Sequence, residues 1–167
     1  AGSLSILQIA PLDLKQVEVI KGSASTLYGG GAIAGIVNLI SKTPEKKKEL
    51  SFFINGTSAG GIDLSTFYSK RFKKTGLTVF ASHNSNRAFD PGSTGFTAIP
   101  KFERYTINPR LFVYAGKTVA DIGISYVSES RTGGSIQYIK HGSPGFYEKN
   151  NTGRNNWVIS QLCQGSI

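Results

Sequence analysis

The protein has 167 residues, of which 39% are hydrophobic and 17% are charged, which is enough for one domain of ordinary size. Its 20 glycines and few charges exclude a coiled coil, its 10 Phe and 7 Tyr argue against intrinsic disorder, and its single cysteine, Cys163, excludes a disulfide framework. The net charge of +9, from 19 basic and 10 acidic residues, indicates an anionic partner such as nucleic acid, lipid phosphate or an anionic ligand.

The two ends of the chain lack the usual marks of a complete protein. It begins at Ala1 without an initiator Met and stops at Ile167 without a terminating feature, so we expect it to be a piece of a longer chain. Its longest apolar run, near residues 31–40, is interrupted by glycine and too short for a membrane-spanning helix.

The segment before Pro44 is compact and rich in glycine. Residues 16–20 alternate polar and β-branched side chains, which predicts a strand. Ser23 or Ser25 could then cap one helical turn, and the glycines at 29–31 allow a tight turn. Residues 36–41 predict a second strand, so the expected order is strand, helical turn, glycine turn and strand.

Composition changes after Pro44. The charged run 45–49 is interpreted as a solvated linker, and after it come short stretches in which apolar and polar residues alternate. They predict six strands, over residues 50–55, 64–69, 77–82, 105–113, 120–126 and 157–162. Pro109 interrupts the fourth stretch and cannot donate to a ladder, but we retain the strand.

The connections between these strands differ in length. Residues 73–76 and 115–118 predict tight turns, whereas 84–104 and 129–155 are long polar stretches that predict loops. Short turns at one end and long loops at the other are typical of a transmembrane antiparallel barrel, although a soluble sandwich could also show them. The alternation alone leaves open whether the apolar row is a core or faces lipid.

No stretch carries a pattern for catalysis, a cofactor or a metal ion. Gly29, Gly31 and Ala34 formally match a dinucleotide fingerprint, but no strand directly precedes Gly29 and no helix follows it. His83 and His141 lie in loop-like stretches without neighbouring metal ligands. We therefore predict no catalytic residue, no cofactor and no metal site, and a protein that is not an enzyme.

One segment resembles a known family. It reads Val-Glu-Val-Ile-Lys-Gly at 17–22, Leu-Tyr-Gly at 27–29 and Ala-Ile-Ala-Gly-Ile-Val-Asn-Leu-Ile at 32–40. In order and spacing, residues 14–44 resemble the last part of the plug of TonB-dependent outer-membrane receptors. The resemblance implies an all-β fragment of a plugged transmembrane antiparallel β-barrel with a small α+β plug remnant. Residues 1–44 would be the C-terminal part of the plug and 45–167 the first six or so barrel strands.

The resemblance also assigns roles to single positions. The plug motif would comprise Gly22, Tyr28, Gly29, Gly35 and Asn38. A Glu and an Arg of this family are buried in the plug, where the Arg pairs with barrel carboxylates, and the matching positions here are Glu18 and Lys21. Lys21 departs from the family pattern because lysine lacks the planar fork of arginine, which puts the strength of a plug–barrel lock in doubt.

The function that the resemblance implies is active uptake of a scarce nutrient across the bacterial outer membrane, with a ferric siderophore or similar chelate as the first expectation. The implied partners are the TonB energy-transducing complex, outer-membrane lipid and lipopolysaccharide, and a small nutrient ligand, with no nucleic acid. The alternative from a different class is a soluble basic all-β module that binds polyanions or carbohydrate.

Basic and aromatic residues are frequent in the two long stretches. We expect this face to attract anions, either a ferric chelate or lipopolysaccharide phosphates, and the aromatic side chains to wall an organic ligand. The alternative without a ligand is that these charges only keep the loops solvated. The candidate ligand-facing residues are Arg87, Phe89, Arg131, Tyr138, Lys140 and Arg154.

Overall fold

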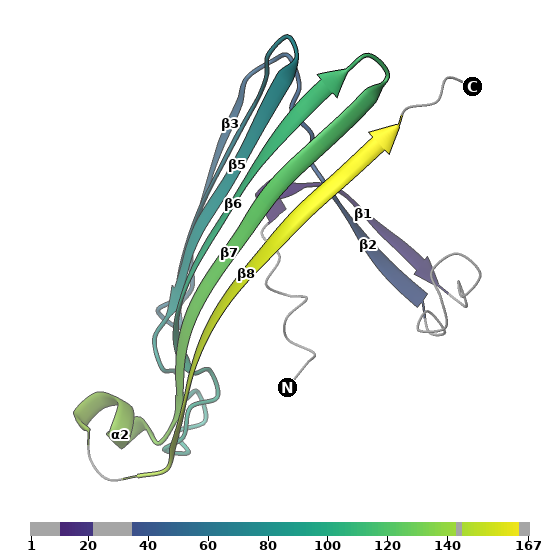
Figure 1. Ribbon diagram of the computed structural model, residues 1–167. Coiled ribbons are helices and arrows are strands. Elements are labelled where there is room, and N and C mark those ends of the chain that lie inside the picture. Colours follow the sequence, from purple (N-terminus) through teal and green to yellow (C-terminus); the bar gives the residue numbers. More distant parts are fainter. Residues whose placement is uncertain (1–10, 22–34, 143–144, 164–167) are drawn as a thin grey trace. The chain divides into compact units, whose positions relative to one another are not determined.

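A computed structural model of the chain describes residues 11–21, 35–142 and 145–163 (Figure 1). The chain divides into two compact units, Ala1–Thr43 and Pro44–Ile167. Each unit is described by itself below.

The first unit contains a two-stranded antiparallel ribbon. A short 3-10 helix, η2 (Pro11–Asp13), leads into β1 (Leu14–Lys21), which pairs with β2 (Gly35–Ser41). Val17 opposes Leu39 and Val19 opposes Val37, so one face of the ribbon is apolar, as β-branched alternation predicts. Both predicted strands of this unit are confirmed, whereas the predicted helical turn and glycine turn lie outside the described residues.

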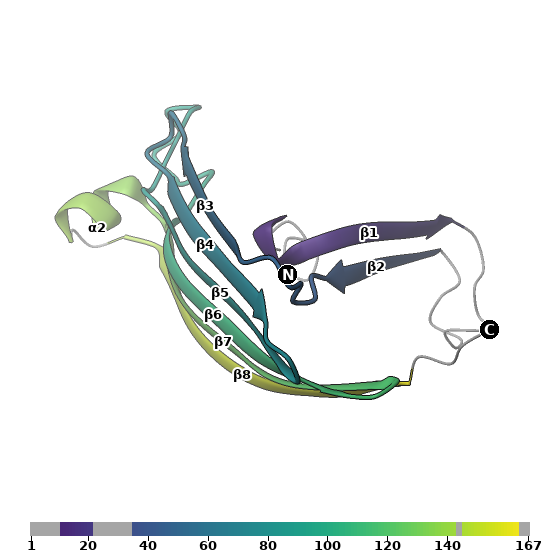
Figure 2. The same cartoon turned by 90° about the horizontal axis from the view of Figure 1, so that it is seen from above.

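The second unit is a six-stranded antiparallel sheet in which every strand pairs with the next along the chain. Figure 2 shows the six strands as one curved layer. The strands are β3 (Glu49–Gly56), β4 (Ile62–Arg71), β5 (Thr75–Asn86), β6 (Lys101–Ala115), β7 (Thr118–Gly134) and β8 (Tyr147–Cys163). All six predicted strands are present.

Three strands are much longer than predicted, which corrects the expected loops. β6 has 15 residues and β7 and β8 have 17 each, so most of 129–155 is a hairpin and not a loop. The true connections are residues 87–100 and 135–146. The prediction was wrong because it relied on alternation of apolar and polar residues, and in these extensions the side chains on both faces of the sheet are mostly polar. Backbone pairing between neighbouring strands does not require hydrophobic alternation.

The described parts of the two long connections contact each other. The second contains a short helix, α2 (Ile136–His141), and in the first Phe89 forms a bridge with Ile99. Phe96 bridges Ser135 of the second connection. Within the described residues, no helix has the length and apolar character needed to cross a membrane.

The turns at the opposite end are tight, as predicted. Phe72 N donates to Thr75 O at 2.7 Å and closes the β4–β5 turn. Gly116 and Lys117 alone connect β6 to β7, and Gly116 has a φ of 61°, which an L-residue with a side chain rarely adopts.

Pro109 lies within β6, as retained in the prediction. It opposes Val79 of β5, while the β6–β7 register passes from the Ile107–Tyr126 pair directly to the Arg110–Gly123 pair. There the hydroxyl of Ser125 donates to Asn108 Oδ1 at 2.8 Å, so a side-chain hydrogen bond joins the two strands beside the proline.

Candidate functional site

The two faces of the six-stranded sheet differ in chemistry, and we name them by their rows of side chains. On the apolar row, Phe52 and Ile54 of β3 are 70% and 77% exposed. The residues directly opposite them on β4, and onward through β5 to β6 and β7, lie on the same face of the sheet. The exposed apolar members of the row are Leu50, Phe52, Ile54, Ile62, Leu64, Tyr105, Ile107, Leu111, Val113, Ile122, Ile124 and Tyr126.

The polar row on the other face is the less exposed one. It combines the buried Phe67, Phe80 and Phe112 with hydrogen-bonding and charged groups. Buried aromatic residues on this row were not expected from its polar character. A soluble sheet would bury its apolar row and expose its polar row, and here the burial is the reverse.

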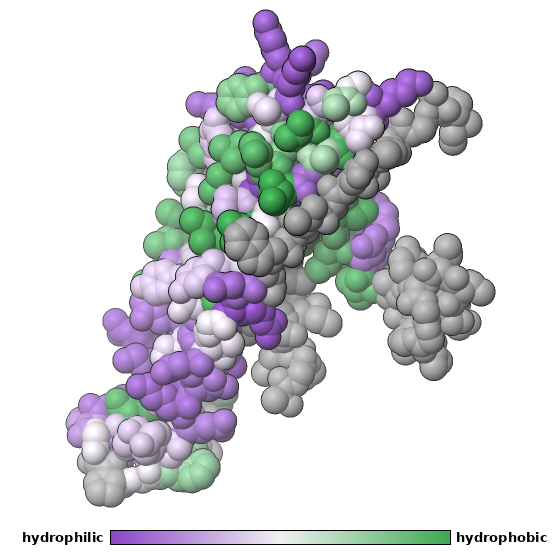
Figure 3. Space-filling view, in the orientation of Figure 1, coloured by the Kyte–Doolittle hydropathy of each residue, from purple (hydrophilic) through white to green (hydrophobic). Residues whose placement is uncertain are grey.

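The apolar character is confined to part of the strand length. Figure 3 shows hydrophobic side chains gathered over the part of the sheet nearer the tight turns, with hydrophilic ones at the tip of that end and again toward α2. On β6 and β7 the apolar row ends at Tyr105 and Tyr126, and beyond them both rows are largely polar. A transmembrane strand needs about 9–11 residues, so strands of this length with this banding would project beyond a bilayer on the side of α2. Tyrosines at such a boundary are typical of barrel strands.

Side chains on the polar row bond across strands. Asp63 of β4 accepts from Asn55 of β3 at 3.0 Å and from Asn84 of β5 at 2.8 Å. Arg110 of β6 donates through Nη2 to Asp121 of β7 at 2.6 Å, with the two side chains 21% and 11% exposed. Polar side chains that are largely withdrawn from bulk water need such ion pairs and side-chain amide hydrogen bonds to satisfy their charges and donors.

A denser charged cluster lies nearer α2 on the same row. Register places Arg104 opposite Glu129 and Phe102 opposite Arg131. Arg104 Nε donates to Glu129 Oε2 at 2.6 Å, and its Nη2 contacts the same oxygen. Arg131 Nη2 lies 2.8 Å from Glu129 Oε1, while its buried Nε has no hydrogen-bond partner among the described residues.

Our reading of the sequence missed the pairing of Arg104 with Glu129. The signal that could have found it is the two-residue turn at Gly116 and Lys117, which sets the register of β6 and β7. Counting outward from that turn pairs Arg104 with Glu129 and Phe102 with Arg131.

The segment that leads into β3 is anchored to the polar row at the tight-turn end. Pro44 is buried, and its carbonyl accepts from the hydroxyl of Tyr114 at 3.3 Å. The Arg71 guanidinium lies 3.7 Å above the Tyr114 ring, and Arg71 N donates to Glu45 O at 2.8 Å. A Cβ on Gly76 would lie 2.5 Å from Pro44 Cγ, so a glycine is needed for this close approach.

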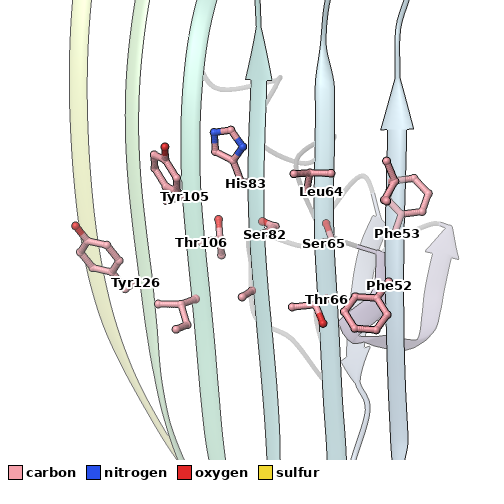
Figure 4. A pocket seen from close by; sticks show the side chains of 13 residues that line it. Phe52, Phe53, Leu64, Ser65, Thr66, Ser82, His83, Tyr105, Thr106 and Tyr126 are labelled. Atoms are coloured by element: carbon pink, nitrogen blue, oxygen red, sulfur yellow. The ribbon is translucent and has the colours of Figure 1, made fainter.

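The apolar row also forms a shallow depression of about 620 Å³ (Figure 4). Phe52, Leu64 and Tyr126 are among its lining residues. At its edge Glu103 accepts from the hydroxyl of Tyr105 at 2.6 Å, and His83 Nε2 lies 3.2 Å from the same carboxylate oxygen.

The predicted plug residues are only partly described. Glu18 accepts from Gln16 Nε2 and from Asn38 Nδ2, both at 2.9 Å, so its carboxylate is engaged within the ribbon. Gly35 begins β2 opposite Lys21, whose side chain lies outside the description. Gly22, Tyr28 and Gly29 also lie outside the described residues, and the plug–barrel lock stays a prediction.

The predicted ligand-facing residues fall into three places. Arg131 and Arg154, expected in a loop, are instead on β7 and β8, where register puts both on the polar row. Arg87 and Phe89 lie in the 87–100 connection. Tyr138 and Lys140 lie on α2, where the Tyr138 ring stacks on Tyr147 at 3.8 Å, and the hydrogen bond with Tyr147 raises the pKa of Tyr138. Their contact with a ligand stays a prediction.

No group of His, Cys, Asp and Glu that could hold a metal ion occurs in the described part of the chain.

Comparison with known proteins finds similarity in both units. Residues 1–36 match the family model of the TonB-dependent Receptor Plug Domain. The chain is 33% identical over 116 residues to the ferrioxamine receptor of Yersinia enterocolitica, an alignment that covers 66% of the chain and 15% of the receptor. It is 29% identical over 135 residues to the vitamin B12 transporter BtuB of Vibrio vulnificus (strain CMCP6), covering 64% of the chain and 22% of the transporter. The chain therefore spans less than a quarter of the length of these two relatives.

Proposed function

The chain is related to TonB-dependent outer-membrane receptors, and we propose that it forms the junction of plug and barrel in a transporter of this kind. The transporter would lie in the bacterial outer membrane and take up a ferric siderophore or similar chelate, with energy delivered by TonB. Outer-membrane lipid and lipopolysaccharide would contact the side chains of the apolar row. The function proposed is transport and not catalysis.

The observation that carries this proposal is the exposure of the apolar row opposite an ion-paired polar row. Ile54 is 77% exposed, while the Arg104 side chain across the sheet is 8% exposed. In water, an apolar surface of this extent is unfavourable and marks an interaction site. Against hydrocarbon the same surface is favourable, and the backbone of a closed barrel satisfies its own hydrogen bonds.

The way the chain enters the sheet supports a plug within the barrel. Pro44 packs on the polar row at the tight-turn end, so the chain reaches β3 across that face. A barrel of many strands is wide enough to need a plug, and its polar row would line the lumen. We accordingly propose that residues up to Pro44 belong to the plug.

The iron-chelate assignment rests on the similarity to a ferrioxamine receptor. The vitamin B12 transporter among the relatives makes a corrinoid the second candidate nutrient. Uptake assays distinguish the two because radiolabelled iron and radiolabelled cobalamin can be offered separately to the same cells.

The experiment uses the full-length receptor that contains this chain, in its native bacterium. We expect it in the outer-membrane fraction. We also expect that uptake of one ferric chelate requires both this receptor and TonB, so that deletion of either abolishes it. Recovery of the intact protein in the soluble fraction would favour the polyanion-binding module instead. Outer-membrane location with unchanged uptake of every iron and corrinoid source would overturn the nutrient assignment.

A further inference from the structure

The cluster around Glu129 on the polar row contains more positive than negative charge. Two guanidinium groups, those of Arg104 and Arg131, share the single carboxylate of Glu129. Arg154 of β8 lies on the same row, two residues from Thr152, which opposes Glu129, and its side chain is exposed. Glu148, also on this row, is exposed and only partly offsets the excess.

The hydrogen-bond inventory of the cluster is incomplete. Both carboxylate oxygens of Glu129 are engaged, Oε2 by Arg104 and Oε1 by Arg131. The Nε of Arg131 is buried and has no acceptor among the described residues. A buried donor on a cation is seldom left without an acceptor, because its desolvation is then uncompensated.

The surroundings hold the two guanidinium groups in place. Phe102, on the same row, contacts both, with its ring centre 6.0 Å from Arg104 Cζ and 5.8 Å from Arg131 Cζ. The Arg104 side chain is 8% exposed and cannot swing into solvent without breaking its fork to Glu129. Arg131 is 32% exposed, so it can be reached from the side that Arg104 does not occupy.

The face on which the cluster lies decides between two sources of an anion. Lipopolysaccharide phosphates would approach from the lipid side, which is the apolar row. Arg104, Glu129 and Arg131 lie on the opposite row, beyond the level of Tyr105 and Tyr126, where the lumen would open toward α2. A small soluble anion can enter there.

We propose that Arg104 and Arg131, oriented by Glu129, form an anion subsite that binds a carboxylate or phosphate group of the transported ligand. The Arg131 side chain is 32% exposed and its Nε has no acceptor among the described residues, and a planar guanidinium can give two parallel hydrogen bonds to such a group. Glu129 keeps the two cations close enough to act together. This inference rests on the proposed function and narrows it to ligands that carry an anionic group.

The test measures anion binding by the purified full-length receptor in lipid nanodiscs, with citrate and inorganic phosphate as probes. We expect R131Q to weaken binding by about 10-fold or more, because one charge-assisted hydrogen-bonding group is lost. R131K keeps the charge but not the fork, so it should recover only part of the affinity. K73Q, in the exposed β4–β5 turn at the opposite end of the sheet, removes one charge as R131Q does and should leave binding unchanged.

Three outcomes would overturn the inference. The first is equal citrate and phosphate binding by the native receptor and R131Q. The second is an equal loss in K73Q, which would indicate only a general attraction of anions. The third is displacement of the probes by lipopolysaccharide added to the nanodisc, which would place the site on the lipid side.

A separate measurement keeps this result distinct from the proposed function. Membrane fractionation and chelate uptake are repeated with R131Q in cells. If the receptor stays in the outer membrane and still transports a neutral chelate, a failed anion assay contradicts the subsite alone. Absence of the native receptor from the outer membrane contradicts the proposed function itself.

Discussion

The guanidinium of Arg110 on β6 reaches diagonally across the sheet to the carboxylate of Asp121 on β7, with Nη2 and Nε at 2.6 Å and 3.2 Å from Oδ2. The residue directly opposite Arg110 is Gly123. A Cβ there would lie 2.6 Å from Arg110 Cγ, so the absence of a side chain at position 123 leaves the path of the arginine open.

Substitution of Gly123 by alanine is expected to displace Arg110 and weaken its pair with Asp121. A partly buried pair that loses its geometry leaves two desolvated charges, so we expect a loss of about 1–3 kcal/mol in unfolding free energy. Urea unfolding of the full-length receptor in lipid measures this loss. Gly153→Ala is the matched control, since a Cβ at Gly153 meets nothing within 4 Å.

The orientation of the two rows is tested by placing arginine on neighbouring positions of β7. Ile124 is on the apolar row and Ser125 is on the polar row. Ile124→Arg should destabilise the receptor in lipid by about 2–4 kcal/mol, and Ser125→Arg by clearly less, because it stays on the polar row and loses only the hydrogen bond to Asn108. Equal effects of the two substitutions on unfolding would show that the apolar row does not face hydrocarbon.

The close packing of Pro44 over Gly76 predicts a change in protease sensitivity. A valine at position 76 would collide with Pro44, whose Cγ would lie 2.5 Å from the new Cβ. We expect Gly76→Val to release the segment and to speed trypsin cleavage at the lysines of 46–48 several-fold. Gly56→Ala serves as a control because a Cβ there meets nothing within 4 Å. Unchanged cleavage in Gly76→Val would mean that Pro44 does not anchor the segment.

The turn after Phe89 is expected to depend on acidity through Asp90. Desolvation raises the pKa of Asp90, but hydrogen bonds from Thr94 N, Gly95 N and the Thr94 hydroxyl together outweigh it, so the pKa is below its ordinary value of 3.8. The stabilisation of the turn is therefore complete above pH 3.8 and is lost as the pH falls through the lowered pKa.

Amide hydrogen exchange at Thr94 and Gly95 of the full-length receptor measures this dependence. Protection should persist from neutral pH to about pH 4 and fall below it, after correction for the intrinsic exchange rate. Asp90→Asn keeps an acceptor oxygen without the charge, so its protection should be weaker and independent of pH. A native turn that opens near neutral pH would contradict the role given to Asp90.

Much of the fold followed from local pattern. Alternation of apolar and polar residues located both strands of the ribbon and all six strands of the sheet, and Gly116 with Lys117 marked a tight turn. Alternation failed where polar residues occupy both rows. For that reason Arg131 and Arg154 were assigned to a loop although both lie in strands.

The amino-acid sequence by itself determined that the chain makes alternating strands, which row of each is apolar, and that its first residues resemble a receptor plug. These are properties of residue spacing along the chain, and the alternation of side chains between the two faces of a strand does not depend on the strand's neighbours. Only the tertiary structure decided that the polar row buries Phe67, Phe80 and Phe112, and that Arg104 and Arg131 share Glu129. Burial and charge pairing depend on register and on neighbours far apart in the chain, and these are set when strands pair and the sheet curves.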